Sequence, residues 1–415
     1  MEQMKTVALI ATLNTKEPEV LYAKQLLEGN GCNTFIIDIS TRDSEHTSAD
    51  ISSTYILNST GIQLETFSQM DKATAVYTMQ IAARKVVRQF FDKGRFDGIL
   101  SIGGGQNAKI SSYVMRGLPY GIPKLLVSPL FSGQRTMDQY IGDMDIMLMH
   151  SIVDFTGVNS VTSVIIKKCA YAMLGMLEHP VPFKKPDNMV TVGITTLGIT
   201  APCTDAVIAN LENERTEVVS FHANGTGGGC MENFIRNGYI DCVFDINLHE
   251  ITCELLGGYS SGSTNRLTAA AASGIPILCA PGAVDIIDYF VASDEVPTNP
   301  PHFEKRQKMY HNNNVCHTKT FKEEIVLVGK EIAHRLNAAV GDVTIVIPLG
   351  GLSEAGALGN PLYNPDVDKA FIQVLKHNLK PNIRIVEVND HINSRACIDA
   401  CLAEGKRLLR IHQIS

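Results

Sequence analysis

The sequence has no long apolar run and no cluster of basic residues. No stretch approaches eighteen uncharged apolar residues, so we expect no transmembrane helix. The 415-residue chain carries a formal net charge of −7, and the absence of a Lys/Arg-rich run argues against a nucleic-acid surface. Acidic and polar residues follow a short apolar run at the start, so we expect no signal peptide. We therefore expect a cytoplasmic protein that contacts neither membrane nor nucleic acid.

Short motifs that identify several enzyme classes are also absent. No G-x-S-x-G serine elbow occurs, and H-E-x-x-H is not met because Ile-Thr-Cys-Glu follows His249 and Glu250. The chain contains neither the Walker phosphate-binding pattern nor G-x-G-x-x-G. Candidate sites must therefore come from turns that match no named motif.

The composition is that of an ordinary globular protein, with 45% hydrophobic and 19% charged residues. Several of its ten cysteines lie inside apolar runs, which is typical of reduced cysteines in a cytosolic protein. Cys397 and Cys401 lie four residues apart on an expected helix, a spacing at which two ligands can share a metal. No second Cys or His pair lies nearby in the sequence, so we interpret both as core residues.

Apolar strands alternate with amphipathic helices along the chain. The first strand, residues 6–10, is followed by a polar turn, a helix and a second apolar strand. Strands that are apolar throughout are typical of a parallel sheet covered on both faces. The sequence therefore predicts an α/β protein with two doubly wound, Rossmann-like domains and mainly parallel sheets.

A segment rich in proline and charge, residues 179–188, is the best candidate for a linker. The strand–turn–helix pattern restarts after it, and residues 239–246 mirror residues 96–102. The two halves thus resemble divergent copies of one unit. We predict an N-terminal nucleotide-binding domain at residues 1–183 and a C-terminal domain at residues 184–415.

Ligands of a doubly wound sheet bind beyond the carboxyl ends of its strands. The first such turn, residues 11–19, begins a helix and offers polar side chains to a ligand. At residues 101–107, three consecutive glycines open another helix. Glycine admits positive φ and lets backbone N–H groups approach a ligand, and a helix N-terminus favours phosphate. The alternative interpretation is tight packing between strand and helix.

Two further segments of the first half extend this predicted nucleotide site. Asp38 ends the second strand, where an acidic residue either takes a ribose hydroxyl or caps a loop. The long loop at residues 128–146 offers phosphate donors, and Asp143 or Asp145 in it can hold Mg²⁺. The predicted nucleotide-binding residues are Thr12, Asn14, Lys16, Asp38, Gly103, Gly104, Gly105, Gln106, Asn107, Ser128, Ser132 and Gly133.

The second half has another glycine cluster before a helix, at residues 225–229. His222 ends the preceding strand and is the first candidate for proton transfer, because imidazole titrates near neutrality. A structural role for this histidine remains the alternative. With Glu232 and His249 it forms the predicted catalytic set. The predicted second ligand site comprises Gly225, Thr226, Gly227, Gly228, Gly258 and Ser261, and later turns add Glu354, Asp390 and His391.

The order of these motifs resembles the Tm-one-like ATP-binding family, the family of the tomato mosaic virus resistance protein. The resemblance covers nearly the whole chain and is carried by ATLNTKEPE, ILSIGGG, FHANGTGGGCMENFI, DINLHEITCELLGG and PLGGLSEAGALGNPLYNPDVD. It implies two Rossmann-like domains, ATP with Mg²⁺ in the N-terminal one, and self-association. A homodimer or higher homo-oligomer is accordingly expected.

Three turns differ from the family pattern. The family's glycine turn is of a Gly-Ser-Gly-Gly-Thr type, whereas this chain reads Gly103-Gly104-Gly105-Gln106-Asn107 and has amides there but no hydroxyl group. Asn14 occupies a position where Asp is usual, and Cys230 one where Arg is common. These changes reduce the number of groups that can contact phosphate.

Three functions remain open at the level of sequence. The first is an ATP-binding enzyme that acts on a small polar metabolite at the interdomain cleft. The second is a non-catalytic binding protein regulated by nucleotide. The third is a lyase, isomerase or hydrolase of sugar acids that uses His222, Glu232 and His249 without nucleotide chemistry.

Overall fold

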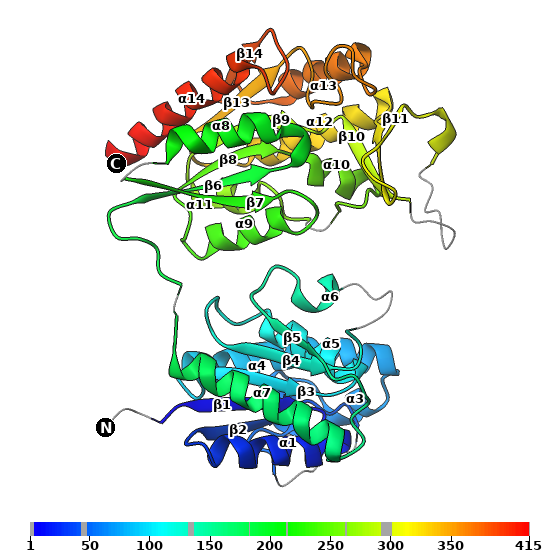
Figure 1. Cartoon of the computed structure of the whole chain (residues 1–415), viewed down its shortest axis with the longest axis vertical. Helices are drawn as coiled ribbons and strands as arrows, with labels where there is room; N and C mark the ends of the chain where they lie inside the picture. The colour runs from blue at the N-terminus through cyan, green and yellow to red at the C-terminus, as the bar shows by residue number, and fades with distance from the viewer. Residues whose placement is uncertain are drawn as a thin grey trace. The chain divides into compact units, whose positions relative to one another are not determined.

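The chain folds into two compact units, Met1–Phe183 and Lys184–Ser415, each with its own parallel sheet (Figure 1). The computed structural model describes residues 4–42, 48–131, 137–181, 183–212, 215–261, 264–291 and 301–414. Helices flank the sheets in both units, so the Rossmann-like α/β class predicted from the alternation of strands and helices is confirmed.

The N-terminal unit is built on a five-stranded sheet in the order β2-β1-β3-β4-β5. Every pair in it is parallel. Its elements are β1 (Thr6–Ala11), α1 (Leu13–Glu28), β2 (Asn33–Asp38), α2 (Ser53–Ser59), α3 (Leu64–Ser68), α4 (Lys72–Asp92), β3 (Gly98–Ile102), α5 (Gly105–Met115), β4 (Lys124–Ser128), α6 (Asp138–Ile141), β5 (Met147–His150) and α7 (Ser160–Glu178).

Period-two alternation along β1 divides its side chains between two helical layers. Val7, Leu9 and Ala11 belong to a core cluster with α1 and α7. Helix α4 packs on α5, which contacts β3 and β4. The strands are therefore buried on both faces, which explains why they are apolar throughout.

Helix α7 comes nearest, among the described residues, to the length and apolarity of a membrane span, although Lys167 and Lys168 interrupt its apolar run. It is the one helix among the described residues that is long and apolar enough to cross a membrane. Its core face carries Ile166, Cys169 and Met173, which have no exposed surface, and it contacts β3 and β4. Packing against the sheet thus accounts for its composition.

The C-terminal unit is built on a six-stranded parallel sheet in the order β14-β13-β9-β8-β6-β7. Its elements are β6 (Val190–Thr196), α8 (Ala201–Leu211), β7 (Thr216–His222), α9 (Gly227–Arg236), β8 (Cys242–Asn247), α10 (His249–Leu256), α11 (Thr268–Ser273), β9 (Ile277–Gly282), β10 (Ile286–Phe290), β11 (Lys308–Tyr310), β12 (Val315–Lys319), α12 (Lys322–Asn337), β13 (Val343–Pro348), α13 (Pro365–Asn378), β14 (Arg384–Val388) and α14 (Arg395–Ile414).

A separate antiparallel sheet, in the order β10-β12-β11, is inserted between β9 and β13. A buried lysine attaches it to the rest of the unit. Lys319, at the end of β12, places its Nζ 2.7 Å from Asp285 and 2.7 Å from Asp368 of α13. Ser353 Oγ also donates to Asp285, over 3.2 Å. The inserted sheet is therefore joined to α13 and to the turn after β9 by buried charge.

This cluster predicts a pH dependence of stability. Burial and the neighbouring Asp285 carboxylate raise the pKa of Asp368 from 3.8 to about 7. The folded chain keeps this proton up to about pH 7, whereas the unfolded chain releases it near pH 4. The free energy of unfolding therefore falls as the pH rises from about 4 to about 7. In Asp368→Asn this fall with pH should disappear, which urea unfolding at several pH values measures.

Asp366→Asn is the matched control, because Asp366 lies in the same helical turn and is exposed. This variant should keep the wild-type pH profile. An equal slope in the wild type and in Asp368→Asn would contradict the assignment.

Candidate functional site

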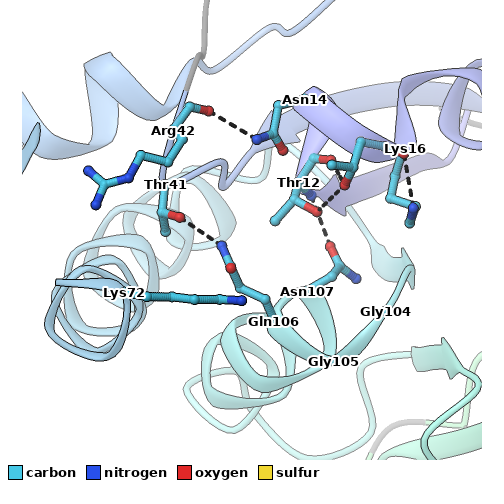
Figure 2. A pocket seen from close by; sticks show the side chains of 11 residues that line it. Thr12, Asn14, Lys16, Thr41, Arg42, Lys72, Gly104, Gly105, Gln106 and Asn107 are labelled. Atoms are coloured by element: carbon cyan, nitrogen blue, oxygen red, sulfur yellow. Dashed lines mark hydrogen bonds between the residues drawn. The ribbon is translucent and has the colours of Figure 1, made fainter.

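A cavity of about 460 Å³ opens at the carboxyl edge of the N-terminal sheet, where α1 and α5 begin (Figure 2). Seven of the predicted nucleotide residues line it, namely Thr12, Asn14, Lys16, Gly104, Gly105, Gln106 and Asn107. Thr15, Thr41, Arg42 and Lys72 complete its lining. The structure therefore brings the first turn and the triple-glycine turn together around one space.

Amide side chains hold these turns in place. Asn107, which is 1% exposed, accepts a hydrogen bond from Thr12 N at 2.9 Å and donates to Ser101 Oγ at 2.8 Å. Gln106 Nε2 donates to Thr41 Oγ1 over 2.7 Å. Asn107 thus joins the β1–α1 turn to the β3–α5 turn. The amides that replace hydroxyl groups of the family pattern have structural partners here.

The three consecutive glycines have different reasons to be glycine, and none adopts a positive φ. A Cβ atom on Gly103 would lie 2.5 Å from Asn107 Cγ, and one on Gly105 would lie 2.9 Å from Leu130 Cδ1. A Cβ atom on Gly104 would meet nothing within 4 Å, and its φ of −79° suits any residue. Gly103 and Gly105 are therefore explained by close packing, whereas Gly104 leaves open space in the cavity.

The two helices that begin at the cavity differ in how their N-termini are satisfied. In α1, Leu13 N donates to Asp38 Oδ1 at 3.1 Å and Asn14 N donates to Ser40 Oγ at 3.1 Å. Helix α5 has Gly104 as its N-cap and no side-chain cap. Within the described part of the chain, no acceptor meets the first backbone N–H groups of α5. Its positive end thus faces the cavity.

Three cationic side chains add to this positive field. Lys16 Nζ donates to the carbonyl of Phe155 over 2.8 Å, and Arg42 donates to the carbonyls of Ser68 and Met70. Lys72, at the first position of α4, makes no hydrogen bond or ion pair with the described residues, and its side chain extends toward the α5 turn (Figure 2). No carboxylate occurs among the described lining residues, so the cavity favours an anion.

Other predicted residues of this half lie away from the cavity lining. Asp38 is fully buried and accepts from Leu13 N and Ser40 N, which is the loop-capping alternative. Ser128 is fully buried at the end of β4, and the carbonyl of Asp143 accepts from Tyr120 Oη. Asp145 pairs with Lys124. Ser132 and Gly133 lie outside the described residues.

Sequence reasoning missed Thr41, Arg42 and Lys72 as lining residues. They lie at the two ends of the polar insertion between β2 and α4, which matches no strand–turn–helix pattern. One signal was available, because Lys72 follows the helix N-cap Asp71 directly, where acidic residues are usual. A cation at that position indicates an anion nearby.

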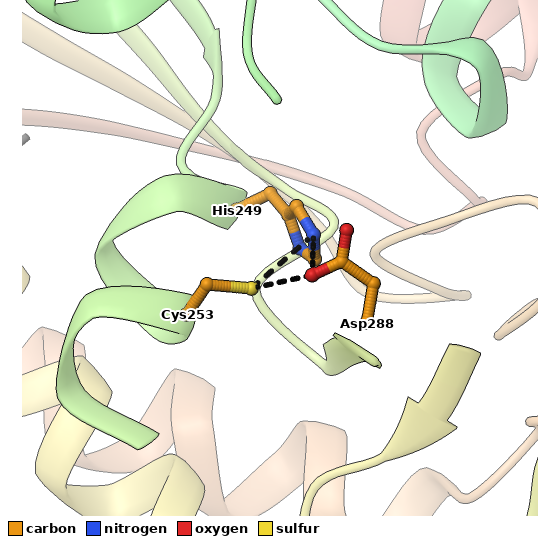
Figure 3. A group of neighbouring side chains, drawn as sticks. All are labelled: His249, Cys253 and Asp288. Atoms are coloured by element: carbon orange, nitrogen blue, oxygen red, sulfur yellow. Dashed lines mark hydrogen bonds and ion pairs between the residues drawn. The ribbon is translucent and has the colours of Figure 1, made fainter. Parts of the chain in front are cut away.

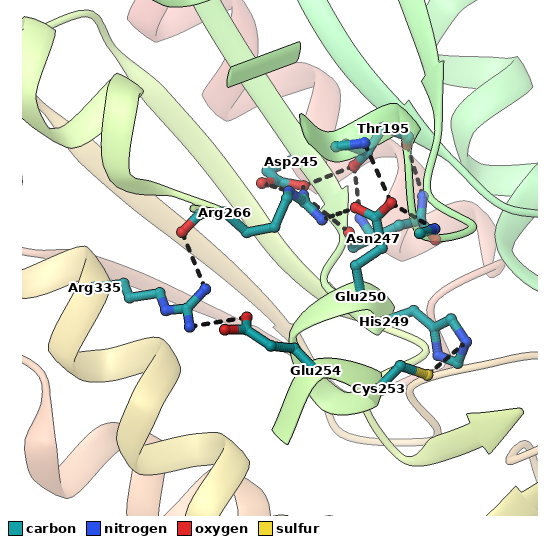
Figure 4. Close-up of polar contacts among 11 residues, drawn as sticks. Thr195, Asp245, Asn247, His249, Glu250, Cys253, Glu254, Arg266 and Arg335 are labelled. Atoms are coloured by element: carbon teal, nitrogen blue, oxygen red, sulfur yellow. Dashed lines mark hydrogen bonds and ion pairs between the residues drawn. The ribbon is translucent and has the colours of Figure 1, made fainter. Parts of the chain in front are cut away.

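The glycine cluster of the second unit is occupied by a side chain of the same unit, that of Glu250, which Figure 4 shows beside Arg266. Glu250 Oε1 accepts from Gly225 N at 2.8 Å and from Gly228 N at 3.3 Å. A Cβ atom on Gly228 would lie 1.9 Å from Glu250 Oε2, and one on Gly227 would lie 2.0 Å from the carbonyl of His222. These glycines therefore make room for Glu250 and for the backbone, and the anion position at the start of α9 is filled by an internal carboxylate.

Arg266 balances the charge of Glu250. Its guanidinium lies 2.5 Å from Glu250 Oε2 and 2.5 Å and 2.7 Å from the two carboxylate oxygens of Asp245, and all three side chains are fully buried. Thr195 Oγ1 donates to Asp245 over 2.8 Å. Burial raises the pKa of Asp245 and likewise that of Glu232. This network links β6, β8 and α10 within the core.

The predicted catalytic residues do not share one environment. His222 is exposed at the end of β7. Glu232 is buried and accepts from Ala269 N at 2.6 Å, while His249 is buried and its Nδ1 lies 3.1 Å from the carbonyl of Ala283. Of the predicted second ligand site, Thr226 lies at the N-cap position of α9 without a side-chain capping hydrogen bond. Gly258 packs on Cys253, and its carbonyl accepts from Ser261 N.

A second cavity, of about 540 Å³, lies beyond the carboxyl ends of β13 and β14. Three titratable side chains line it, Glu354, Asp390 and His391. His391 Nδ1 accepts from Asn393 N over 3.2 Å, and its Nε2 lies 4.0 Å from Asp390 Oδ1. The late polar turns of the sequence therefore converge on a space of their own.

All ten cysteines are free thiols. Cys397 and Cys401 lie in the core between α8 and α14, together with Cys203. Hydrogen bonds from Cys397 and Cys401 lower the pKa of Cys203 to about 5. These cysteines thus form a buried thiol cluster that the sequence spacing alone did not indicate.

The fold defines a two-unit α/β protein whose first unit has a cavity lined by cationic side chains at an uncapped helix N-terminus. The chain belongs to the uncharacterised protein family UPF0261, whose N-terminal domain matches residues 5–182 and whose C-terminal domain matches residues 189–409. A UPF0261 protein of Clostridium tetani is 34% identical over 98% of this chain and 99% of that protein.

The tomato mosaic virus resistance protein Tm-1(GCR237) of Solanum lycopersicum is 31% identical over 75% of this chain and 42% of the tomato protein. The family resemblance predicted from the motifs is therefore confirmed. Among solved structures, MurG of Acinetobacter baumannii is 12% identical over 99% of this chain and 93% of that chain, with a TM-score of 0.20. That likeness supports no argument about function.

The buried arginine yields a prediction on stability. Arg266→Met should lower the free energy of unfolding by about 3–5 kcal/mol, because it leaves the carboxylates of Asp245 and Glu250 buried without a cation. Urea unfolding followed by circular dichroism measures the change. Arg236→Met, on the exposed face of α9, is the control and should stay within about 0.5 kcal/mol of wild type. Equal effects of the two substitutions would contradict the role of the network.

Proposed function

We propose that the N-terminal unit binds ATP with Mg²⁺, with the phosphates at the N-terminus of α5. The observation that carries this proposal is Gly104. Neither backbone conformation nor packing requires glycine there, yet a side chain would enter the cavity directly beside the unsatisfied N–H groups of α5. Because Gly104 has no side chain, a phosphate can approach these backbone N–H groups closely.

The charges of the cavity fit the same ligand. Lys16, Arg42 and Lys72 surround a space without a carboxylate among its described lining residues, and a triphosphate supplies the missing negative charge. Lys72 has no partner among the described residues, so it is free to pair with a phosphate oxygen. ATP in particular, rather than another phosphorylated molecule, is what the family resemblance implies.

Magnesium fits the pocket as part of the nucleotide complex. Mg²⁺ commonly binds through substrate phosphates, water and few protein oxygens. The hydroxyl groups of Thr12 and Thr15, 3.3 Å apart at the cavity, are the side-chain oxygens that would hold it. The ion would neutralise phosphate charge. Asp143, the sequence-based candidate for this role, does not line the cavity.

The lining favours retention of the nucleotide over its hydrolysis. Neither histidine nor carboxylate occurs among the described lining residues, so none of them is suited to activate an attacking water. The name of the tomato relative describes virus resistance rather than a reaction. Both observations support the second of the three functions, a binding protein whose state depends on nucleotide.

An enzyme acting on a small polar metabolite, such as a sugar acid, is the alternative. The observation that favours it is the cavity beyond β13 and β14, where Glu354, Asp390 and His391 combine acid–base groups in one space. This cavity replaces the set of His222, Glu232 and His249 as the place for such chemistry, since Glu232 and His249 are buried elsewhere.

Gly104→Val tests the nucleotide site. The valine side chain would occupy the phosphate position, so the affinity for ATP with Mg²⁺ should fall at least about 100-fold, as two displaced hydrogen bonds to charged groups predict. Isothermal titration calorimetry measures this affinity. Gly175→Val is the control, because a Cβ atom on Gly175 of α7 also meets nothing within 4 Å but lies outside the cavity lining.

No heat of binding for the wild type at millimolar ATP would refute the proposal. Unchanged affinity in Gly104→Val would remove this cavity as the site. Phosphate release measured on the same samples distinguishes the functions, because binding without turnover is expected of a nucleotide-regulated binding protein.

A further inference from the structure

Three side chains of different chemistry meet in the C-terminal unit (Figure 3). His249 and Cys253 lie one helical turn apart on α10, and Asp288 lies in the middle of β10. Cys253 Sγ is 3.4 Å from His249 Nε2 and 3.0 Å from Asp288 Oδ1, and Nε2 is 3.3 Å from Oδ1. All three are buried, so a nitrogen, a sulfur and an oxygen ligand atom face one another out of contact with solvent.

These separations match one triangular face of a tetrahedral metal site. Zinc binds sulfur at about 2.3 Å, nitrogen at about 2.0–2.1 Å and carboxylate oxygen at about 2.0–2.2 Å. At tetrahedral angles, such ligands lie about 3.3–3.6 Å from one another. The nitrogen–oxygen and sulfur–nitrogen separations are within about 0.2 Å of this geometry, and the sulfur–oxygen separation is about 0.6 Å shorter than it. Small side-chain shifts suffice to admit the ion.

The surroundings orient these atoms as they do in metal sites. His249 Nδ1 lies 3.1 Å from the carbonyl of Ala283, which can only accept, so Nδ1 carries a proton and Nε2 points at the cluster. Ala283 has a φ of 59°, a strained conformation for a residue with a side chain. Ser260 Oγ donates to Asp288 Oδ2 over 2.5 Å, and Ser260 N donates to Oδ1, the oxygen that also faces the cluster, over 3.1 Å. Both outer contacts fix a ligand in place.

The three facing atoms call for a positive charge between them. In the neutral imidazole with its proton on Nδ1, Nε2 is an acceptor that faces the carboxylate oxygen of Asp288 at 3.3 Å. The thiol of Cys253 has one proton, so it can donate to His249 Nε2 or to Asp288 Oδ1 but not to both. A cation between the three atoms satisfies all of them, and protonation of the imidazole is the competing solution.

We propose that the C-terminal unit binds one zinc ion through His249 Nε2, Cys253 Sγ and the Asp288 carboxylate. Thiolate, imidazole and carboxylate together are a zinc ligand set. The ion would link α10 to the inserted antiparallel sheet through β10. His317 stands opposite Asp288 on β12, is 9% exposed, and its Nδ1 has no hydrogen-bond partner among the described residues. It is placed to supply the fourth ligand after a side-chain rotation, in competition with water.

The test uses the full chain without a polyhistidine tag. Plasma mass spectrometry of the purified protein should find one zinc per chain after zinc loading. Cobalt titration into the chelator-treated protein should give a thiolate-to-cobalt absorption band. Cys253→Ala should abolish that band and weaken zinc binding at least about 100-fold, the upper end of losses seen when only an outer contact is removed. Cys242→Ala, another fully buried cysteine of this unit, should leave both unchanged.

Asp288→Asn keeps the side-chain shape while removing the ligand charge, and it should lose the metal with an unchanged circular dichroism spectrum. His317→Ala should alter the cobalt spectrum if His317 is a ligand and leave it unchanged if water is; the proposal on the other three ligands stands in either case. A wild type that takes up neither zinc nor cobalt, or a Cys253→Ala variant with full affinity, would overturn the proposal. ATP titration of the same samples reports on the other unit, so the two proposals fail separately.

Discussion

Several parallel strands of this protein lead into a helix within a few residues, and the first backbone N–H groups of each such helix need an acceptor. The chain meets this constraint at α1 and α9 and, among the described residues, leaves it open at α5. Asp38 and Ser40 supply the acceptors for α1, and Glu250 supplies them for α9. Helix α5 receives no side-chain cap, and no acceptor for its first N–H groups is found within the described residues. The same physical demand thus separates two internally satisfied turns from one that is suited to an external anion.

The repeating part of the fold could be predicted from the sequence, because buried parallel strands and their helices follow from local apolar patterning. The inserted sheet β10-β12-β11 could not, since its strands are short and its attachment depends on Lys319 meeting Asp285 and Asp368 across long separations. The candidate site was likewise predictable from the sequence only in part. The turns that line the first cavity were recognisable from glycine and polar residues, whereas Lys72 was brought in by an insertion without a regular pattern.

Similar glycine-rich turns proved to have opposite meanings for physical reasons that no local pattern contains. At residues 103–105 the open position beside Gly104 is revealed only by what surrounds its missing side chain. At residues 225–229 the decisive residue is Glu250, more than twenty positions later, and its charge is balanced by Arg266, sixteen positions further on. His249 and Asp288 are likewise distant in sequence, so sequence spacing could single out His249 but not the group that it joins.

The filled turn of α9 also constrains where the second unit can bind a ligand. An anion entering that turn would have to displace Glu250, a carboxylate held in place by the fold and already paired with Arg266. Displacing Glu250 would leave its carboxylate and the guanidinium of Arg266 as two buried charges without their partners, which costs several kcal/mol of stability. A ligand of this unit therefore meets less opposition at the cavity beyond β13 and β14, where His391 and Asp390 are partly exposed and no buried ion pair has to be broken. Because of this internal ion pair, a ligand of the second unit is expected at the carboxyl ends of β13 and β14 rather than at the turn between β7 and α9.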